Sequence, residues 1–145
     1  MDVGYGQTMA DMNEFNQNLI AEFRANDGKV SGQFAGSPLI LVTHTGAKSG
    51  VARTSPLVYT RDGDRIVLIA SKGGAPSHPH WYLNMIATPL VTVELPGETY
   101  QARVVEAVGA ERDRLYAAQA DQMAAFKEYA AKTDRVIPVL VLERV

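Results

Sequence analysis

Apolar residues recur at spacings of three and four between Thr8 and Phe23, which predicts an amphipathic helix. The run Asn26-Asp27-Gly28 is typical of a helix end and should terminate it. We expect the apolar face of this helix to pack on the rest of the domain, with contact to a membrane or a partner protein as the alternative.

A second kind of pattern begins at Pro38, where short apolar or β-branched runs alternate with turn residues. The first half of this region predicts strands over Pro38–Thr45, Thr54–Thr60 and Arg65–Ala70. The connection Arg61–Asp64 contains an Asp-Gly pair, which tolerates the positive φ of a tight hairpin turn. Neighbouring strands should therefore be antiparallel.

The second half of the region mixes helices and strands. Pro79 suits the start of a short helix that ends at Ala87, because its missing N–H costs nothing there. The remaining predicted elements are strands over Leu90–Leu95 and Thr99–Val105, a long helix over Ala110–Lys132 and a last strand over Val136–Leu142. Pro138 removes one ladder donor from that last strand, so an edge, a bulge or a barrel corner is expected there.

Six strands in hairpins, with an N-terminal helix, a short middle helix and a long C-terminal helix, lack the strand–helix alternation of a parallel doubly wound sheet. The pattern predicts a mainly β, α+β fold in which the sheet is a small barrel or is strongly bent. We expect a single domain, with residues 1–35 forming the N-terminal helix and linker and residues 36–145 forming the barrel.

Composition narrows the classes of function. The 145-residue chain has a formal net charge of -2, which argues against general nucleic-acid binding. It contains no cysteine, and this excludes disulfides, thiolate nucleophiles and cysteine-ligated metals. The N-terminus lacks the pattern of a secretion signal, so a cytoplasmic location is expected.

Two loops at predicted strand ends combine glycines, hydroxyls and cations, namely Gly46–Gly50 and Ser71–Gly74. Such loops present backbone N–H groups and positive charge to a phosphate or a carboxylate, although ordinary solvated turns have the same composition. Neither loop matches the P-loop or the dinucleotide-binding fingerprint.

Aromatic residues on two predicted helices could face a ligand. Trp81 and Asn84 share one face of the short helix, and a planar ring could lie against that face; the alternative is that Trp81 only anchors the helix. On the long helix, Phe126 or Tyr129 could cap a cleft, with core packing as the simpler explanation. The three histidines have no acidic partner at a recognised ligand spacing, and we expect no metal site.

Several motifs in fixed order resemble the deazaflavin-dependent nitroreductase family of actinobacteria. They are Thr45-Gly46-Ala47-Lys48-Ser49-Gly50, Arg53 through Leu57, Ala70-Ser71-Lys72-Gly73-Gly74, Pro79-x-Trp81-Tyr82-Leu83-Asn84 and Thr133-Asp134-Arg135-x-Ile137-Pro138. The resemblance covers nearly the whole chain after Gly36. It implies a split β-barrel related to flavin mononucleotide-binding barrels and the use of reduced coenzyme F420 as hydride donor.

The resemblance also implies roles for particular residues. Lys48 and Ser49 should meet the anionic tail of the cofactor, and Arg53 and Lys72 should meet its phosphate. The residues implied for the cofactor body and for the pocket beside the ring are Thr54, Ser55, Pro56, Leu57, Val58, Ile69, Ala70, Ser71, His80, Trp81, Tyr82, Leu83 and Asn84.

At the substrate end, well-known nitroimidazole-reducing members carry several tyrosines, whereas this chain has Met123, Phe126 and Tyr129. We therefore expect a small-molecule acceptor that is an activated alkene or a quinone, with Phe126 and Tyr129 contacting it and Tyr129 as candidate proton donor. A non-catalytic F420 carrier or sensor, and a barrel for flavin mononucleotide or haem, are the alternatives. A homodimer and at most a weak peripheral association with a membrane are expected.

Overall fold

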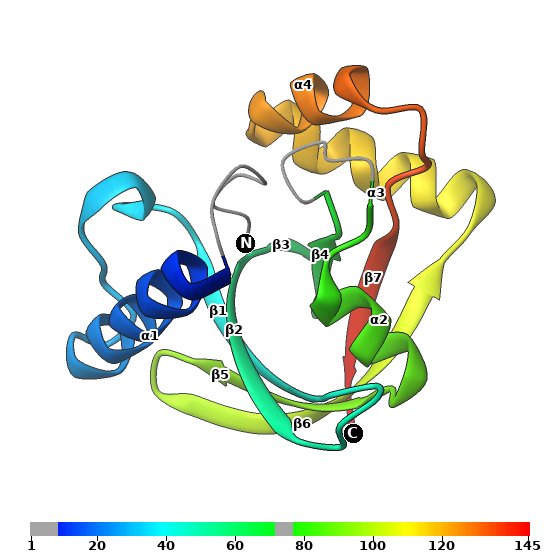
Figure 1. The fold of residues 1–145 in the computed structure, drawn as a ribbon. Helices are drawn as coiled ribbons and strands as arrows, with labels where there is room; N and C mark the ends of the chain where they lie inside the picture. Colours follow the sequence, from blue (N-terminus) through cyan, green and yellow to red (C-terminus); the bar gives the residue numbers. More distant parts are fainter. Residues whose placement is uncertain (1–8, 72–76) are drawn as a thin grey trace.

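The computed structural model describes residues 9–71 and 77–145 of the chain, and its ribbon is shown in Figure 1. In chain order the elements are α1 (Met9–Ala25), the 3-10 turn η1 (Gly32–Phe34), β1 (Leu39–Thr45), β2 (Ala52–Val58), β3 (Thr60–Asp62), β4 (Arg65–Ile69), α2 (His80–Ala87), β5 (Leu90–Leu95), β6 (Glu98–Ala107), α3 (Gly109–Gln122), α4 (Ala125–Lys132) and β7 (Val139–Arg144).

The strands form one antiparallel sheet in the order β2-β1-β5-β6-β7-β4-β3. The two strands at its edges, β2 and β3, are consecutive in the chain and are separated only by Tyr59. Chain continuity therefore joins the two edges, and the sheet curls into a split barrel (Figure 1). The predicted mainly β, α+β split barrel is confirmed, but it has seven strands rather than six, because the predicted strand Thr54–Thr60 bends at Tyr59.

The apolar runs of the sequence are strands covered on both faces. Ile40 and Val42 of β1 point into the barrel core, whereas Leu39 and Leu41 face α1 on the outside. In β4 and β7, alternate residues likewise point into the barrel core and out toward α3 and α4. A strand that alternates between two buried surfaces needs apolar residues at every position, so the sequence shows no polar alternation there.

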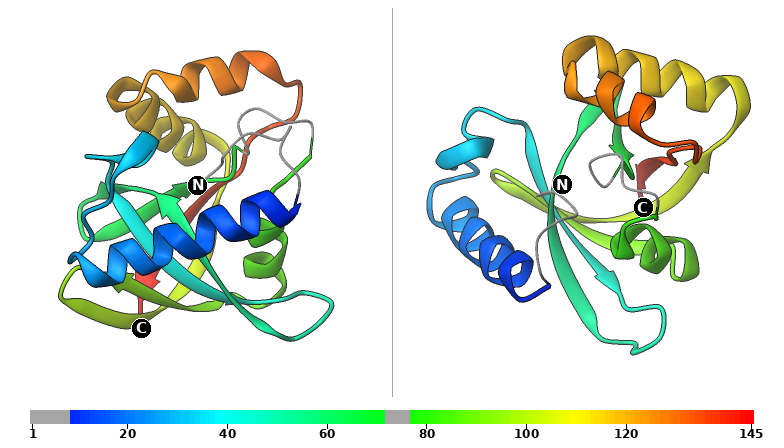
Figure 2. Two further views of the ribbon diagram at one scale, coloured as in Figure 1. Left: turned by 60° about the vertical axis from the view of Figure 1, so that its left-hand side comes forward. Right: turned by 45° about the horizontal axis from the view of Figure 1, so that its top comes forward.

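Helix α1 lies along the outside of the sheet (Figure 2). Leu19 and Phe23 are buried against β1, and Arg24 donates to both carboxylate oxygens of Glu94 at 3.0 and 2.8 Å. The prediction that the apolar face of this helix packs on the domain is therefore confirmed. No helix in the described part of the chain is long and apolar enough to cross a membrane.

The prediction of one continuous helix over Ala110–Lys132 is wrong, because the segment divides into α3 and α4. Met123 adopts an extended conformation with φ -134° and ψ 97°, although the sequence there has neither Gly nor Pro. The hydroxyl of Tyr116 donates to the carbonyl of Phe126, which holds the first turn of α4 against α3. Burial of Phe126 in the core beneath both helices thus overrides local helix propensity.

The last strand also starts later than predicted. Pro138 lies just before β7 rather than inside it, and its carbonyl accepts a hydrogen bond of 2.9 Å from the N–H of Ala70. Since Pro138 precedes the ladder, its missing donor interrupts no strand pairing.

Candidate active site

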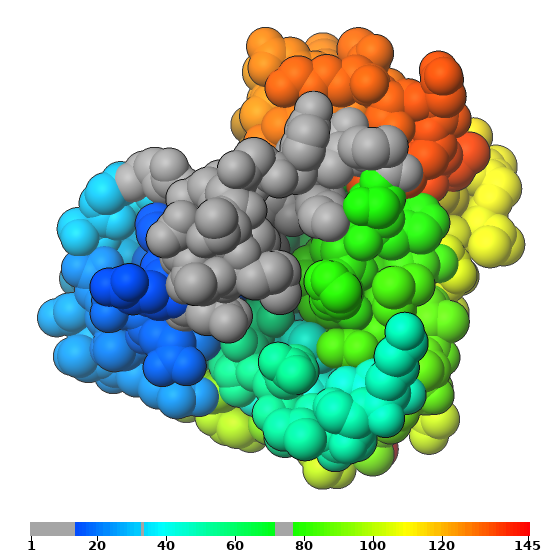
Figure 3. Space-filling model, viewed as in Figure 1, coloured from blue at the N-terminus to red at the C-terminus, as the bar shows by residue number. Residues whose placement is uncertain are grey.

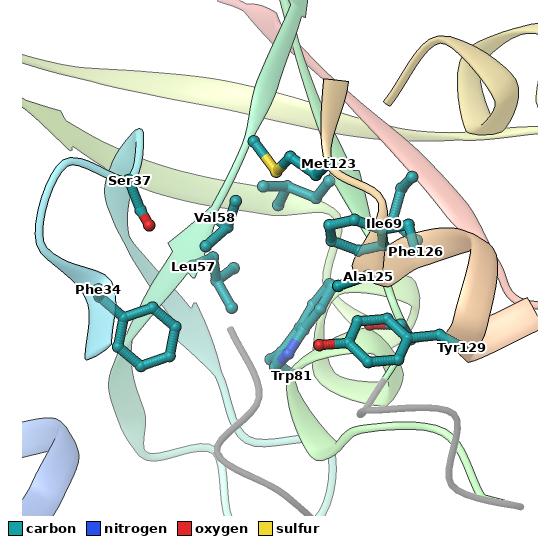
Figure 4. Close-up of a pocket in the computed structure, with 12 residues that line it drawn as sticks. Phe34, Ser37, Leu57, Val58, Ile69, Trp81, Met123, Ala125, Phe126 and Tyr129 are labelled. Atoms are coloured by element: carbon teal, nitrogen blue, oxygen red, sulfur yellow. The ribbon is translucent and has the colours of Figure 1, made fainter. Parts of the chain in front are cut away.

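A cavity of about 250 Å³ opens between the bent strand β2, the end of β4, the start of α2 and the joint between α3 and α4. Figure 4 shows its walls, which are lined by Phe34, Ser37, Leu57, Val58, Leu68, Ile69, Ser71, Trp81, Met123, Ala125, Phe126 and Tyr129. In the space-filling view, α1, α2 and α4 and the hairpin between β1 and β2 surround this face of the molecule (Figure 3). The cavity lies beside the end of β2, just before the chain passes at Tyr59 to the other edge strand, β3.

One wall of the cavity carries an unsatisfied donor. Trp81 has only 7% of its surface exposed, and its indole Nε1–H is buried without a hydrogen-bond partner among the residues that the structure describes. Pro79 is the N-cap of α2, so Trp81 lies in the first turn of the helix, and its ring lines the cavity. A buried donor without a partner costs free energy that a ligand acceptor can recover.

The opposite wall is supplied by α4. Phe126 and Tyr129 pack edge to face with ring centroids 5.3 Å apart, and the hydroxyl of Tyr129 points toward Trp81 in Figure 4. The break at Met123 sets the direction of α4, so that both rings reach the cavity. Met123 extends this wall, whereas Phe34 and Ser37 lie across the cavity from Phe126 and Tyr129 (Figure 4). The side-chain hydroxyls in the lining are those of Ser37, Ser71 and Tyr129.

The structure brings together seven of the residues named from the sequence, since Leu57, Val58, Ile69, Ser71, Trp81, Phe126 and Tyr129 all line the cavity. Lys48 and Ser49 lie on the exposed connection between β1 and β2, and Arg53 is exposed near the start of β2. The Ser49 hydroxyl accepts a hydrogen bond from Val51 N–H at 3.2 Å. Lys72 lies outside the described residues.

The other named residues do not line the cavity. Thr54 and Pro56 lie on the face of β2 opposite to Ser55 and Leu57, and Ala70 is buried in the barrel core. On α2, His80 and Leu83 are exposed, whereas Asn84 is buried on the same face as Trp81.

Tyr82 is engaged elsewhere on α2, because its hydroxyl donates to the carboxylate of Glu106 at 2.8 Å. Burial, with this contact to Glu106, raises the pKa of Tyr82 to about 12. The phenol therefore stays protonated and ties α2 to β6.

Four lining residues were not named from the sequence: Leu68 and Ala125, which adjoin the named residues Ile69 and Phe126, and, in a separate segment, Phe34 and Ser37. Phe34 and Ser37 could not be anticipated from a motif. They come from the connection between α1 and β1, which has no periodic pattern. A single aromatic residue between Gly32 and Gly36 is the one available signal, and it does not reveal which surface the ring contacts.

A curled antiparallel sheet whose edge strands β2 and β3 are joined through Tyr59 places the chain in the class of split β-barrel proteins. Comparison with known proteins identifies the family: the model for F420H(2)-dependent quinone reductases matches residues 16–144. The chain belongs to this family, and it is an oxidoreductase whose hydride donor is reduced coenzyme F420.

Individual relatives agree with this assignment. The F420H(2)-dependent quinone reductase Rv1261c of Mycobacterium tuberculosis is 36% identical over 128 residues, which are 86% of each chain. A solved F420-H2 dependent reductase, FDR-A, is 38% identical with a TM-score of 0.67, and the match covers 73% of this chain and 94% of that one. A second solved structure, described as a domain-swapped dimer, is 34% identical with a TM-score of 0.69 and covers 94% of this chain and all of its own.

The haem storage protein HutZ of Vibrio cholerae has the same fold with a TM-score of 0.57, but it is only 10% identical over 87% of each chain. This likeness concerns the fold alone.

Proposed function

We propose that the cavity between β2, β4, α2 and α4 holds the deazaflavin ring and that the hydride acceptor is a quinone. The observation that carries this proposal is the composition of the walls. A buried indole N–H on α2 lies in a mainly apolar cavity whose lining also includes the hydroxyls of Ser37, Ser71 and Tyr129.

The described residues fit a deazaflavin on physical grounds. The Trp81 donor suits a carbonyl or a nitrogen acceptor at the edge of a heteroaromatic ring, and the flanking side chains of Leu57 and Ile69 give apolar contact with ring faces. Lys48 and Arg53 lie on the neighbouring hairpin, where their charge favours a phosphate and a carboxylate tail. When bound, reduced F420 supplies the hydride, that is, one proton with two electrons.

The chain itself contributes position and a proton path. Phe34, Met123 and Phe126 exclude water from the acceptor end, which strengthens every polar interaction there. The hydroxyls of Ser71 and Tyr129 can donate hydrogen bonds to a quinone oxygen as it gains negative charge. The hydride would bring two electrons and one proton to the quinone, and the Tyr129 hydroxyl would supply the second proton and regain one from solvent, so that the product leaves as the hydroquinone.

The experiment is an acceptor panel assayed with reduced F420, comparing a quinone, a cyclic enone and a nitroimidazole. We expect the quinone to have the highest kcat/KM, and Tyr129→Phe to lower kcat more than it raises KM for the quinone. Preferential reduction of the enone would show that the acceptor is an activated alkene rather than a quinone. Binding of F420 without oxidation by any acceptor would favour the carrier or sensor alternative.

We also propose that the chain forms a homodimer. The solved relative that is described as a domain-swapped dimer supports this, as do the exposed apolar residues Leu83 and Ile86 of α2 and Leu90 of β5. Light scattering during gel filtration tests it, and a mass of one chain, 15.7 kDa, would contradict it.

A further inference from the structure

A continuous chain of hydrogen bonds runs beside the cavity and links four segments. The N–H of Ala47 donates to Oδ1 of Asn84 at 2.8 Å, and Nδ2 of Asn84 lies 3.1 Å from Nδ1 of His44. The other ring nitrogen of His44, Nε2, lies 2.8 Å from the hydroxyl of Ser55. His44 and Asn84 are buried, with 3% and 7% of their surfaces exposed.

The hydrogen bond from Ala47 N–H to Asn84 determines which group donates and which accepts in each of the other hydrogen bonds of this network. A backbone N–H can only donate, so the oxygen of the Asn84 amide must face Ala47 and its NH₂ must face His44. Nδ1 of His44 therefore accepts, which places the ring proton on Nε2 and makes Ser55 Oγ an acceptor. Burial, together with the charge of Arg53, lowers the pKa of His44 to about 4, consistent with a neutral ring.

The Ser55 hydroxyl accepts a hydrogen bond from His44, so its own O–H can donate to another group. The pairing of β1 with β2 sets Ser55 opposite Val42 and Arg53 opposite His44, so Arg53, Ser55 and the cavity-lining Leu57 alternate onto the same inner face of β2. An anion needs donors only. A serine that donated its hydrogen bond to His44 would instead present oxygen lone pairs to that anion, and these would repel it.

We propose that His44 is a positioning residue, which fixes the Ser55 hydroxyl so that its proton is donated, beside the Arg53 guanidinium, to a phosphate oxygen of the bound cofactor. This inference rests on the proposed function. His44 acts only through Ser55 and does not touch the reacting atoms.

Substitutions at position 44 separate polarity from packing. His44→Gln keeps one acceptor and one donor on a planar group, His44→Glu offers acceptors that turn the Ser55 proton inward, and His44→Leu removes both. Thr43→Val is the matched control, because Thr43 is one residue away on the same strand and its hydroxyl bonds to Thr54 at 2.8 Å on the other face of the sheet.

The measurement is the Kd of oxidised F420 and, in parallel, of the deazaflavin fragment that lacks the phosphate and the tail. We expect His44→Glu and His44→Leu to weaken F420 binding roughly ten- to hundredfold, with His44→Gln and Thr43→Val within about threefold of the unaltered protein. Binding of the fragment should hardly change. In a Ser55→Ala background, His44→Leu should have little further effect, because both substitutions remove the same interaction.

Equal losses for F420 and the fragment, or fully additive effects of His44→Leu and Ser55→Ala, would overturn the inference. If His44→Leu does not fold, as judged by thermal unfolding, the comparison of His44→Gln with His44→Glu decides. Failure of the unaltered protein to bind F420 would overturn the proposed function as well, whereas strong binding by every variant would overturn only the role of His44.

Discussion

Arg135 holds the backbone of Ser71 in place, since its Nη2 donates to the Ser71 carbonyl at 2.6 Å. Its Nη1 also donates to the carbonyl of Ala70 at 3.1 Å and to Nδ1 of His78 at 3.0 Å. One guanidinium from the segment before β7 thus holds both the chain after β4, which carries Ser71 to the cavity, and His78, two residues before the start of α2.

Loss of these three Arg135 hydrogen bonds should affect kcat/KM more than the free energy of unfolding. We predict that Arg135→Lys lowers kcat/KM for the quinone roughly tenfold, because an ammonium group cannot bond all three acceptors in one plane. Steady-state kinetics with reduced F420 measure this. Arg114→Lys, which alters an exposed ion pair with Asp62, is the control and should leave the kinetics unchanged. Equal effects of the two substitutions would show that Ser71 is held by other contacts.

The depressed pKa of His44 predicts a pH dependence of stability. Its ring is neutral in the folded protein down to about pH 4, whereas the unfolded chain takes up a proton at the ordinary value of 6.5. The resulting stabilisation is complete above pH 6.5 and is lost as the pH falls toward 4. One pKa unit corresponds to about 1.4 kcal/mol, so the loss reaches up to about 3 kcal/mol.

Urea unfolding at pH 7 and at pH 4 measures this loss, with His44→Gln as the comparison. The glutamine variant lacks the titrating group, so its free energy of unfolding should fall less than that of the unaltered protein. The same decrease in both proteins would mean that other groups, such as His78, account for the acid sensitivity; burial and the nearby Arg135 also lower the pKa of His78.

The break between α3 and α4 should depend on a single hydroxyl. We predict that Tyr116→Phe costs about 1 kcal/mol of unfolding free energy and raises KM for the quinone, because the Phe126 carbonyl loses its donor and α4 is held less firmly. Denaturant unfolding and steady-state kinetics measure the two effects. Tyr100→Phe, in the sheet, provides the control. An unchanged KM would mean that packing alone places α4.

Helix α1 should influence the acceptor end through one aromatic pair. Phe15 meets Phe34 edge to face at 5.9 Å between ring centroids, and Phe34 lines the cavity. We predict that Phe34→Ala raises KM for the quinone severalfold and that Phe15→Ala has a smaller effect of the same sign, in keeping with about 0.5–1.5 kcal/mol for such a pair. Effects on F420 affinity rather than on quinone KM would place the acceptor elsewhere.

The sequence predicted the elements where periodicity was strong. Strands β1 and β5 and helix α2 lie within a residue or two of their expected ranges, because apolar runs and Pro79 mark them clearly. The bend at Tyr59 and the break at Met123 have no local sequence signal, since β2 and β3 pair with different strands and Phe126 is buried against residues of β4 and β7.

The site was only partly predictable for the same reason. Trp81 and Asn84 could be placed on one helical face from their spacing, but the contact of Asn84 with His44 joins residues 40 positions apart. The seven named residues that line the cavity came chiefly from family motifs. Phe34 and Ser37 lie outside every motif and reach the cavity only through the path of the chain after α1.

We propose that the cofactor ring binds against Trp81, which is the chain's one tryptophan. A two-dimensional ¹H–¹⁵N spectrum of the protein should therefore contain one indole cross-peak, which reports on the unpartnered Nε1–H directly. We predict that titration with oxidised F420 shifts this cross-peak downfield and that the shift saturates at the Kd found by other methods. An indole cross-peak that stays in place while F420 binds would show that the cofactor ring does not bind against Trp81.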